Sequence, residues 1–149
     1  MELDRNGLEV LDRTECLHLL ARATFGRVAT TASALPTILP VNYCLDGDTI
    51  IIRTGEGAKL DAAARNAVVA FEADELDSIY HAGWSVVVTG IAREVTDPEQ
   101  LTQLQHAPVR RWAPRGDGCV MAISTAVISG RRILPGSGGE QVIKARTSP

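Results

Sequence analysis

Alternating apolar and polar positions run through most of the chain after Gly26, and this period of two predicts short β-strands. The predicted strands cover residues 27–32, 37–45, 49–54, 67–73, 84–95, 119–124 and 126–134. Asp46-Gly47-Asp48 separates the second strand from the third, and Asp-Gly between two such runs is a strong hairpin signal. Residues 67–73 are mostly apolar, which predicts a buried strand.

Three short helices are predicted around these strands. The first begins after Asp12, with Glu15 three residues later closing a capping box, and it ends before Gly26. The second covers the Ala-rich residues 59–66, and the third begins at Asp97-Pro98-Glu99. A succession of hairpins with helices at their ends predicts a mainly β protein, a small antiparallel barrel with peripheral helices. A Rossmann sheet would need a helix between successive strands.

The length of 149 residues corresponds to about one domain, here residues 1–135. Residues 136–149 carry Gly, Ser and Pro without an apolar period, so we expect a disordered tail that folding does not require. No apolar run approaches the roughly 20 residues of a membrane span. Glu2 and Asp4 stand where a signal peptide would be basic, which favours a cytoplasmic protein without a membrane partner.

Charge and cysteine content narrow the classes of function. The 15 basic and 18 acidic residues give a net charge of −3, which disfavours a nucleic-acid partner. The three cysteines are far apart and show no metal-ligand spacing, so no metal site is expected. No Ser/His/Asp group and no paired carboxylates are recognisable. Any chemistry is therefore expected to come from a cofactor.

The segment after the third strand has the layout of a phosphate-binding turn. Arg53 and Thr54 end the strand, the glycines of residues 55–57 permit a tight turn, and Lys59 lies in the first turn of the next helix. Cations, a hydroxyl and free helix N–H groups are the donors that a phosphate needs. Leu60 follows the lysine, so this is not a Walker loop. An ordinary Gly-rich turn with a solvated lysine is the alternative.

The order and spacing of several segments resemble the pyridoxamine 5′-phosphate oxidase-like flavoproteins. The matching segments are residues 26–29, 39–43, 46–48, 53–54 with 57–60, 68–72 and 83–90, and the likeness extends over about residues 10–134. These relatives are FMN-binding split β-barrels, and the chain is most similar to the branch that includes nitroimidazole-resistance reductases. The resemblance implies an FMN cofactor, a homodimer with two flavins at its interface, and a small-molecule substrate.

The resemblance also implies roles for individual residues. The cofactor-binding residues that it implies are Pro40, Val41, Asn42, Tyr43, Arg53, Thr54, Lys59, Leu60, Trp84 and Ser85. The strand from Pro40 to Tyr43 would turn its backbone to the pyrimidine edge of the flavin, and Arg53, Thr54 and Lys59 would hold the phosphate. Trp84 and Ser85 would come from the strand near the dimer seam. The alternative for Tyr43 and Trp84 is ordinary packing in the core.

Arg131, on the last strand, could reach an anionic group of the substrate, or it could form a solvated pair with Arg132. No histidine follows His106, whereas vitamin B6 oxidases and haem-degrading relatives have one there. The activity that the resemblance implies is therefore a flavin-dependent oxidoreductase with another small-molecule substrate. The alternatives are a non-catalytic flavin or ligand carrier and a deazaflavin-dependent reductase of the same fold.

Overall fold

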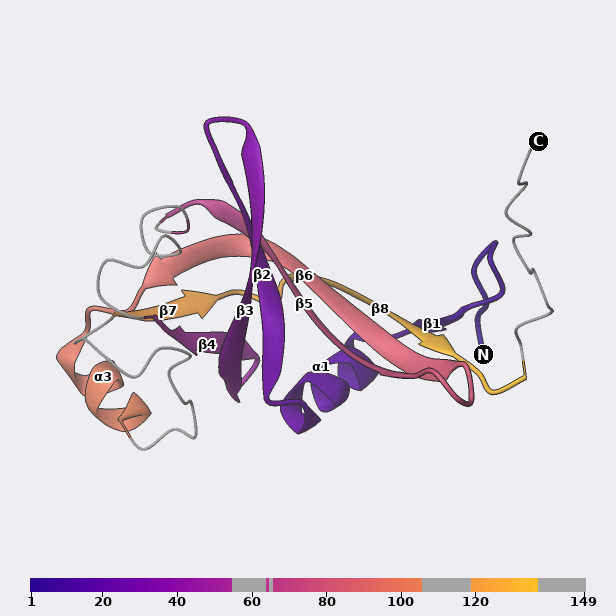
Figure 1. The fold of residues 1–149 in the computed structure, drawn as a ribbon. Coiled ribbons are helices and arrows are strands. Elements are labelled where there is room, and N and C mark those ends of the chain that lie inside the picture. The colour runs from indigo at the N-terminus through magenta and orange to yellow at the C-terminus, as the bar shows by residue number, and fades with distance from the viewer. Residues whose placement is uncertain (55–63, 65, 106–118, 137–149) are drawn as a thin grey trace.

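In the computed structural model the described residues are 1–54, 64, 66–105 and 119–136 (Figure 1). The elements in chain order are β1 (Glu9–Leu11), α1 (Arg13–Arg22), β2 (Phe25–Ala32), β3 (Leu35–Asp46), β4 (Thr49–Arg53), β5 (Val68–Asp77), β6 (Ala82–Glu94), α3 (Pro98–Leu104), β7 (Val120–Ile123) and β8 (Val127–Ile133). The predicted strands and the first and third helices are confirmed. The short strand β1 was not predicted. Among the described residues, no helix is long and apolar enough to cross a membrane.

Six antiparallel strands form a closed ring in the order β6, β5, β2, β3, β4 and β7. The ring closes because β6 has different partners along its length. Its first part, from Gly83 to Thr89, pairs with β8, and Ala92 to Glu94 pair with β7. Strand β1 extends the sheet beyond β8. The predicted mainly β antiparallel barrel is therefore confirmed.

The barrel interior is filled by side chains that alternate along the strands. Val28, Phe71 and Val88 lie opposite one another on three neighbouring strands, and all three are buried. Residues 67–73 were predicted to form a buried strand. This prediction is wrong for one face of the strand, since Val68 is 66% exposed. A strand in a barrel wall has one face outside the barrel, and every second side chain of β5 lies there.

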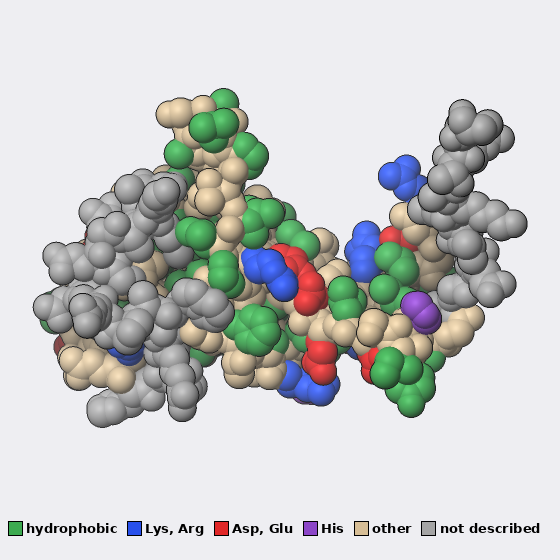
Figure 2. Space-filling view, in the orientation of Figure 1, with side chains coloured by type: hydrophobic (Ala, Val, Ile, Leu, Met, Phe, Trp, Pro, Cys, Tyr) green, Lys and Arg blue, Asp and Glu red, His purple; other side chains and the backbone are tan. Residues whose placement is uncertain are grey.

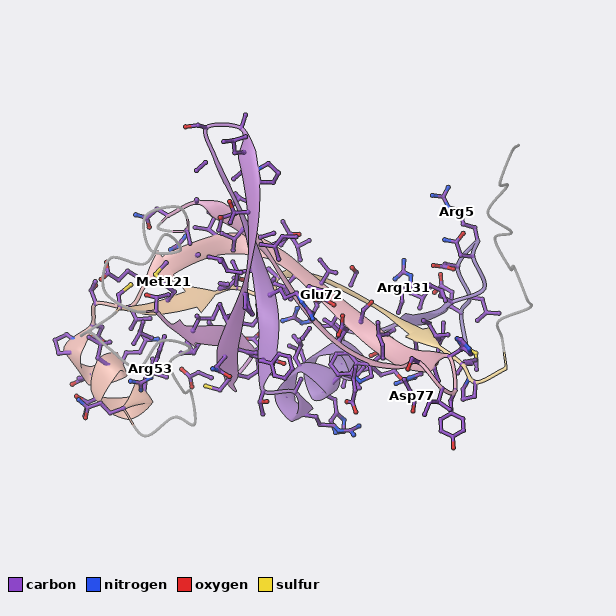
Figure 3. All side chains as sticks on the ribbon, in the orientation of Figure 1. Arg5, Arg53, Glu72, Asp77, Met121 and Arg131 are labelled. Carbon is purple, nitrogen blue, oxygen red and sulfur yellow. The ribbon has the colours of Figure 1, made fainter. Side chains whose placement is uncertain are left out.

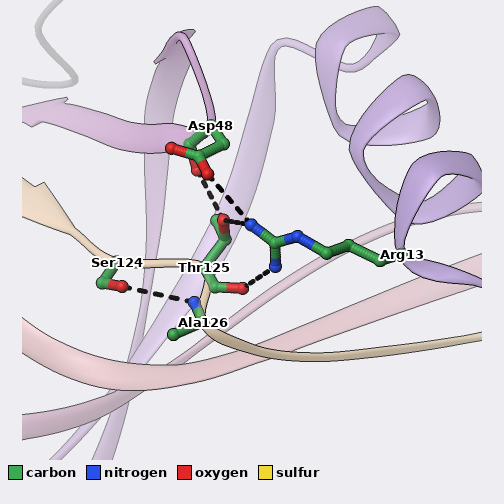
Figure 4. A network of polar contacts seen from close by, with 5 residues as sticks. All are labelled: Arg13, Asp48, Ser124, Thr125 and Ala126. Atoms are coloured by element: carbon green, nitrogen blue, oxygen red, sulfur yellow. Dashed lines mark hydrogen bonds and ion pairs between the residues drawn. The ribbon is translucent and has the colours of Figure 1, made fainter.

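Helix α1 is fixed to the barrel through its first residue (Figure 4). Asp12 and Glu15 form the predicted capping box. The Arg13 guanidinium donates to the backbone carbonyl and the hydroxyl of Thr125, and it pairs with Asp48 at 3.0 Å. The Thr125 hydroxyl donates to the Asp48 carbonyl at 2.6 Å. This network joins the helix, the β3–β4 turn and the link between β7 and β8.

Helix α3 covers the barrel on the side of β4. Its N-cap is Asp97, as predicted, and its Leu104 packs with Ile51 and Val120 in a second apolar cluster outside the ring. The hairpin of β2 and β3 projects well beyond the barrel (Figure 1). The predicted helix 59–66 lies largely outside the described residues, as does the predicted tail except for Gly136.

Candidate functional site

The strand predicted to face the flavin alternates between the core and the outer surface of the barrel. Val41 and Tyr43 are buried, whereas Pro40 is exposed and Asn42 is half-buried. The Tyr43 hydroxyl donates to the carbonyl of Leu20 at 2.6 Å, and burial raises the pKa of this phenol. Its ring also meets Phe71 edge to face. The Tyr43 side chain thus belongs to the core, and only the backbone of this residue is left for a ligand.

The end of β4 carries the two described residues of the predicted phosphate site. The Arg53 guanidinium donates to the Leu104 carbonyl, and its Nε atom is buried without a hydrogen-bond partner in the described part of the chain. Thr54 is held firmly, because its backbone N–H and its hydroxyl both reach the Cys119 carbonyl, at 2.9 and 3.2 Å. Lys59 and Leu60 lie outside the described residues.

A buried N–H without an acceptor is costly, because the group has lost water and gained nothing in return. An anionic ligand at the end of β4 would supply the acceptor that the Arg53 Nε atom lacks. The side chains of Val41 and Tyr43 on β3 and of Ile52 on β4 fill the inside of the ring. Because side chains alternate along a strand, Pro40, Asn42 and Arg53 lie on the outer side of the barrel. These described residues fit a ligand that carries a phosphate.

Trp84 and Ser85 are neighbours in sequence but lie on opposite faces of β6. Trp84 is buried in the core, and its indole also lines a cleft of about 510 Å³ with Arg22 of α1 and residues 75–79 of the β5–β6 hairpin. Ser85 lies on the outer face, opposite Asp74 on one side and Arg131 on the other. The structure therefore brings Ser85, but not the Trp84 side chain, to the face that Pro40 and Asn42 share.

Arg131 forms an ion pair in this structure. Its Nε donates to a carboxylate oxygen of Asp4 at 3.0 Å, and a second guanidinium nitrogen donates to the Gly130 carbonyl. The other Asp4 oxygen accepts from the backbone N–H groups of Leu8 and Asn6, and these hydrogen bonds lower the pKa of Asp4. The alternative of a solvated pair with Arg132 does not describe the arrangement, because Arg132 pairs separately with Glu9.

The outer face of the sheet also holds a charged group that the sequence analysis missed (Figures 2 and 3). Arg27 of β2 lies 3.1 Å from Glu72 and 3.5 Å from Asp74, both on β5. Burial raises the pKa of Glu72, and the neighbouring Asp74 carboxylate raises it further, against the opposing effect of Arg27. The expectation that the chain has no paired carboxylates is therefore wrong.

Register explains why this group was missed and why it matters. Arg27 lies opposite Glu72 on one side and opposite Pro40 on the other, so the charged group is next to the strand predicted to face the flavin. The spacing of Glu72 and Asp74, two residues apart on a strand, is visible in the sequence and puts both on one face. Their pairing with Arg27 depends on the alignment of two distant strands.

Comparison with known proteins gives the family. Residues 12–132 match the family described as pyridoxamine 5′-phosphate oxidase, and the chain belongs to it. A protein of Mycobacterium tuberculosis, the uncharacterized protein Rv0080, is 43% identical over 132 residues, which are 85% of this chain and 86% of that protein.

Two solved structures extend the comparison to the fold. The FAD-binding protein from Mycobacterium smegmatis is 37% identical with a TM-score of 0.73, and the match covers 83% of this chain and 97% of that one. A FAD-binding protein from Mesorhizobium loti shares the fold at 23% identity, with a TM-score of 0.68 and coverage of 85% and 99%. The predicted split-barrel fold is thereby confirmed.

Proposed function

We propose that the protein binds FMN on the outer face of the barrel and acts as a flavin-dependent oxidoreductase on a small molecule. The observation that supports this most is the end of β4, where the buried Arg53 Nε needs an acceptor and Thr54 is rigidly placed beside it. Membership of the family supports the same proposal. The backbone at Pro40 and Asn42 would receive the flavin ring, and Arg53, Thr54 and Lys59 the phosphate. When bound, a flavin supplies hydride and electron transfer.

FAD is the second candidate cofactor, because the Mycobacterium smegmatis relative is described as binding it. The deazaflavin alternative shares the same fold. A direct test is to titrate the purified full-length protein with FMN, FAD and a deazaflavin in turn, and to measure binding by the fluorescence of each cofactor. We expect FMN to bind most tightly, and steady-state turnover with a nicotinamide donor and a panel of acceptors to exceed that of free FMN. Tight binding without turnover would instead identify a non-catalytic flavin carrier.

The outer face has a composition that favours a second copy of the chain as its partner. The exposed side chains of Val68 and Ile91 lie opposite each other on β5 and β6, and Val127 on β8 is 65% exposed. Ile38 on the projecting β3 is 66% exposed. Apolar side chains gathered on one sheet face commonly mark an interaction surface. We therefore propose a homodimer that covers this face and encloses the flavin between the two copies.

Replacing Val127 with aspartate should convert the dimer to a monomer and weaken FMN binding in parallel, because a carboxylate at the centre of an apolar interface loses water without gaining a partner. Light scattering at micromolar protein concentration measures the first effect and flavin fluorescence the second. Ile79→Asp, at the tip of the β5–β6 hairpin, is the matched control, because Ile79 is also exposed, at 80%, and this variant should remain dimeric. A monomeric wild-type protein would contradict the proposal.

A further inference from the structure

We propose that Glu72 donates the proton in the reduction carried out at this site. This inference rests on the proposed function, since it needs a reduced flavin as the source of hydride.

The position of Glu72 in the sheet is the first argument. Its strand β5 lies between β2 and β6, and its side chain is on the outer face, only 28% exposed. Arg27 separates Glu72 from Pro40, so the distance across the sheet from β5 to β3 is two strand spacings, about 10 Å. A ring system lying along β3 over this face would extend toward the carboxyl.

The groups around Glu72 are the second argument. Toward β2 the charged neighbour is Arg27 at 3.1 Å, and along its own strand it is Asp74. From β6 the residue opposite is Val87, which does not titrate. One guanidinium cannot fully neutralise the negative charge of two carboxylates. Glu72, beside Asp74, therefore keeps its proton more readily than an isolated glutamate does.

This arrangement suits a group that releases one proton. When bound, a reduced flavin would supply the hydride that a quinone needs, and it would be left oxidised. The Glu72 carboxyl would give its proton to the quinone oxyanion, which would leave the hydroquinone and the Glu72 carboxylate. Arg27 then stabilises that carboxylate, and a proton from water restores the acid. The proposal thus gives the acceptor class as quinones and similar compounds whose reduction consumes a proton.

The test compares two electron acceptors in the FMN-loaded, photochemically reduced full-length protein. Menadione needs a proton during its reduction, whereas ferricyanide takes electrons alone. For Glu72→Gln we expect reoxidation by menadione to slow about 100-fold, in the range of general acid catalysis, and reoxidation by ferricyanide to stay unchanged. The wild-type rate with menadione should fall as the pH rises through the pKa of Glu72. Glu99→Gln, on the far helix α3, is the matched control and should behave as wild type.

Two further measurements separate a proton donor from a structural residue. Asp74→Asn should move the pH profile to lower pH and keep the full rate at low pH, since it removes the neighbouring negative charge. The ¹³C signal of the Glu72 carboxyl should titrate at higher pH after FMN is added, because a covering ligand removes water from it. Equal slowing with both acceptors, or a titration that FMN leaves unchanged, would overturn the proposal for Glu72 alone. Absence of FMN binding would overturn the proposed function, and this inference with it.

Discussion

Replacing Phe71 with alanine should lower the free energy of unfolding by about 4 kcal/mol, the usual cost of removing a buried phenyl ring. Phe71 is fully buried, lies at the centre of the barrel between Val28 and Val88, and contacts the Tyr43 ring at a centroid distance of 4.8 Å. Urea denaturation followed by circular dichroism measures the change. The substitution also removes the ring that packs edge to face against Tyr43, so the Tyr43 hydroxyl is held less firmly.

Phe25→Ala is the matched control for this substitution. Phe25 lies on the neighbouring strand β2, but its ring is 56% exposed, so the unfolding free energy should change by no more than about 0.5 kcal/mol. Comparable losses in the two variants would show that the barrel interior is not the main source of stability.

Arg53→Met should weaken FMN binding about 30-fold, which corresponds to about 2 kcal/mol, because a hydrogen bond to a charged group contributes roughly 1.5–3 kcal/mol. The same size of effect is expected for Lys59→Met from the family resemblance. Isothermal titration with FMN measures both. Methionine keeps much of the apolar stem of each side chain, so the fold should survive, which circular dichroism checks.

Arg93→Met provides the control, because Arg93 is an exposed arginine on β6 whose neighbour across the ladder is Ala122 of β7. Its loss should leave the FMN dissociation constant within twofold of wild type. Unchanged affinity in a correctly folded Arg53→Met variant would exclude the end of β4 as the phosphate site.

The strands could be predicted because their signals are local. The Asp46-Gly47-Asp48 turn and the alternation on either side of it define the β3–β4 hairpin without knowledge of the rest of the chain, and the Asp12 cap does the same for α1. Closure of the ring could not be predicted in this way. It depends on β6 changing partner from β8 to β7, and nothing in the local pattern of residues 82–94 marks that change.

The same difference between local signals and long-range contacts explains which parts of the candidate site could be predicted from the sequence and which were missed. Arg53 and Thr54 were found because the proposed phosphate site is a contiguous segment. The contact of Arg131 with Asp4 joins residues 127 positions apart, and Arg27 meets Glu72 across 45 positions. Such pairs follow from register, which is set by the whole barrel.

Because β7 comes late in the chain, β4 lacks one of its two partner strands for part of the time that the protein is being translated. Strand β4 is complete at Arg53, but its partner β7 begins at Val120, so one edge of β4 remains unpaired while the intervening residues are made. At 5–20 residues per second this interval lasts roughly 3–13 s. An open strand edge can pair with other nascent chains. The apolar run Ile50–Ile52, which supplies this edge, is therefore open to such pairing until β7 has been made.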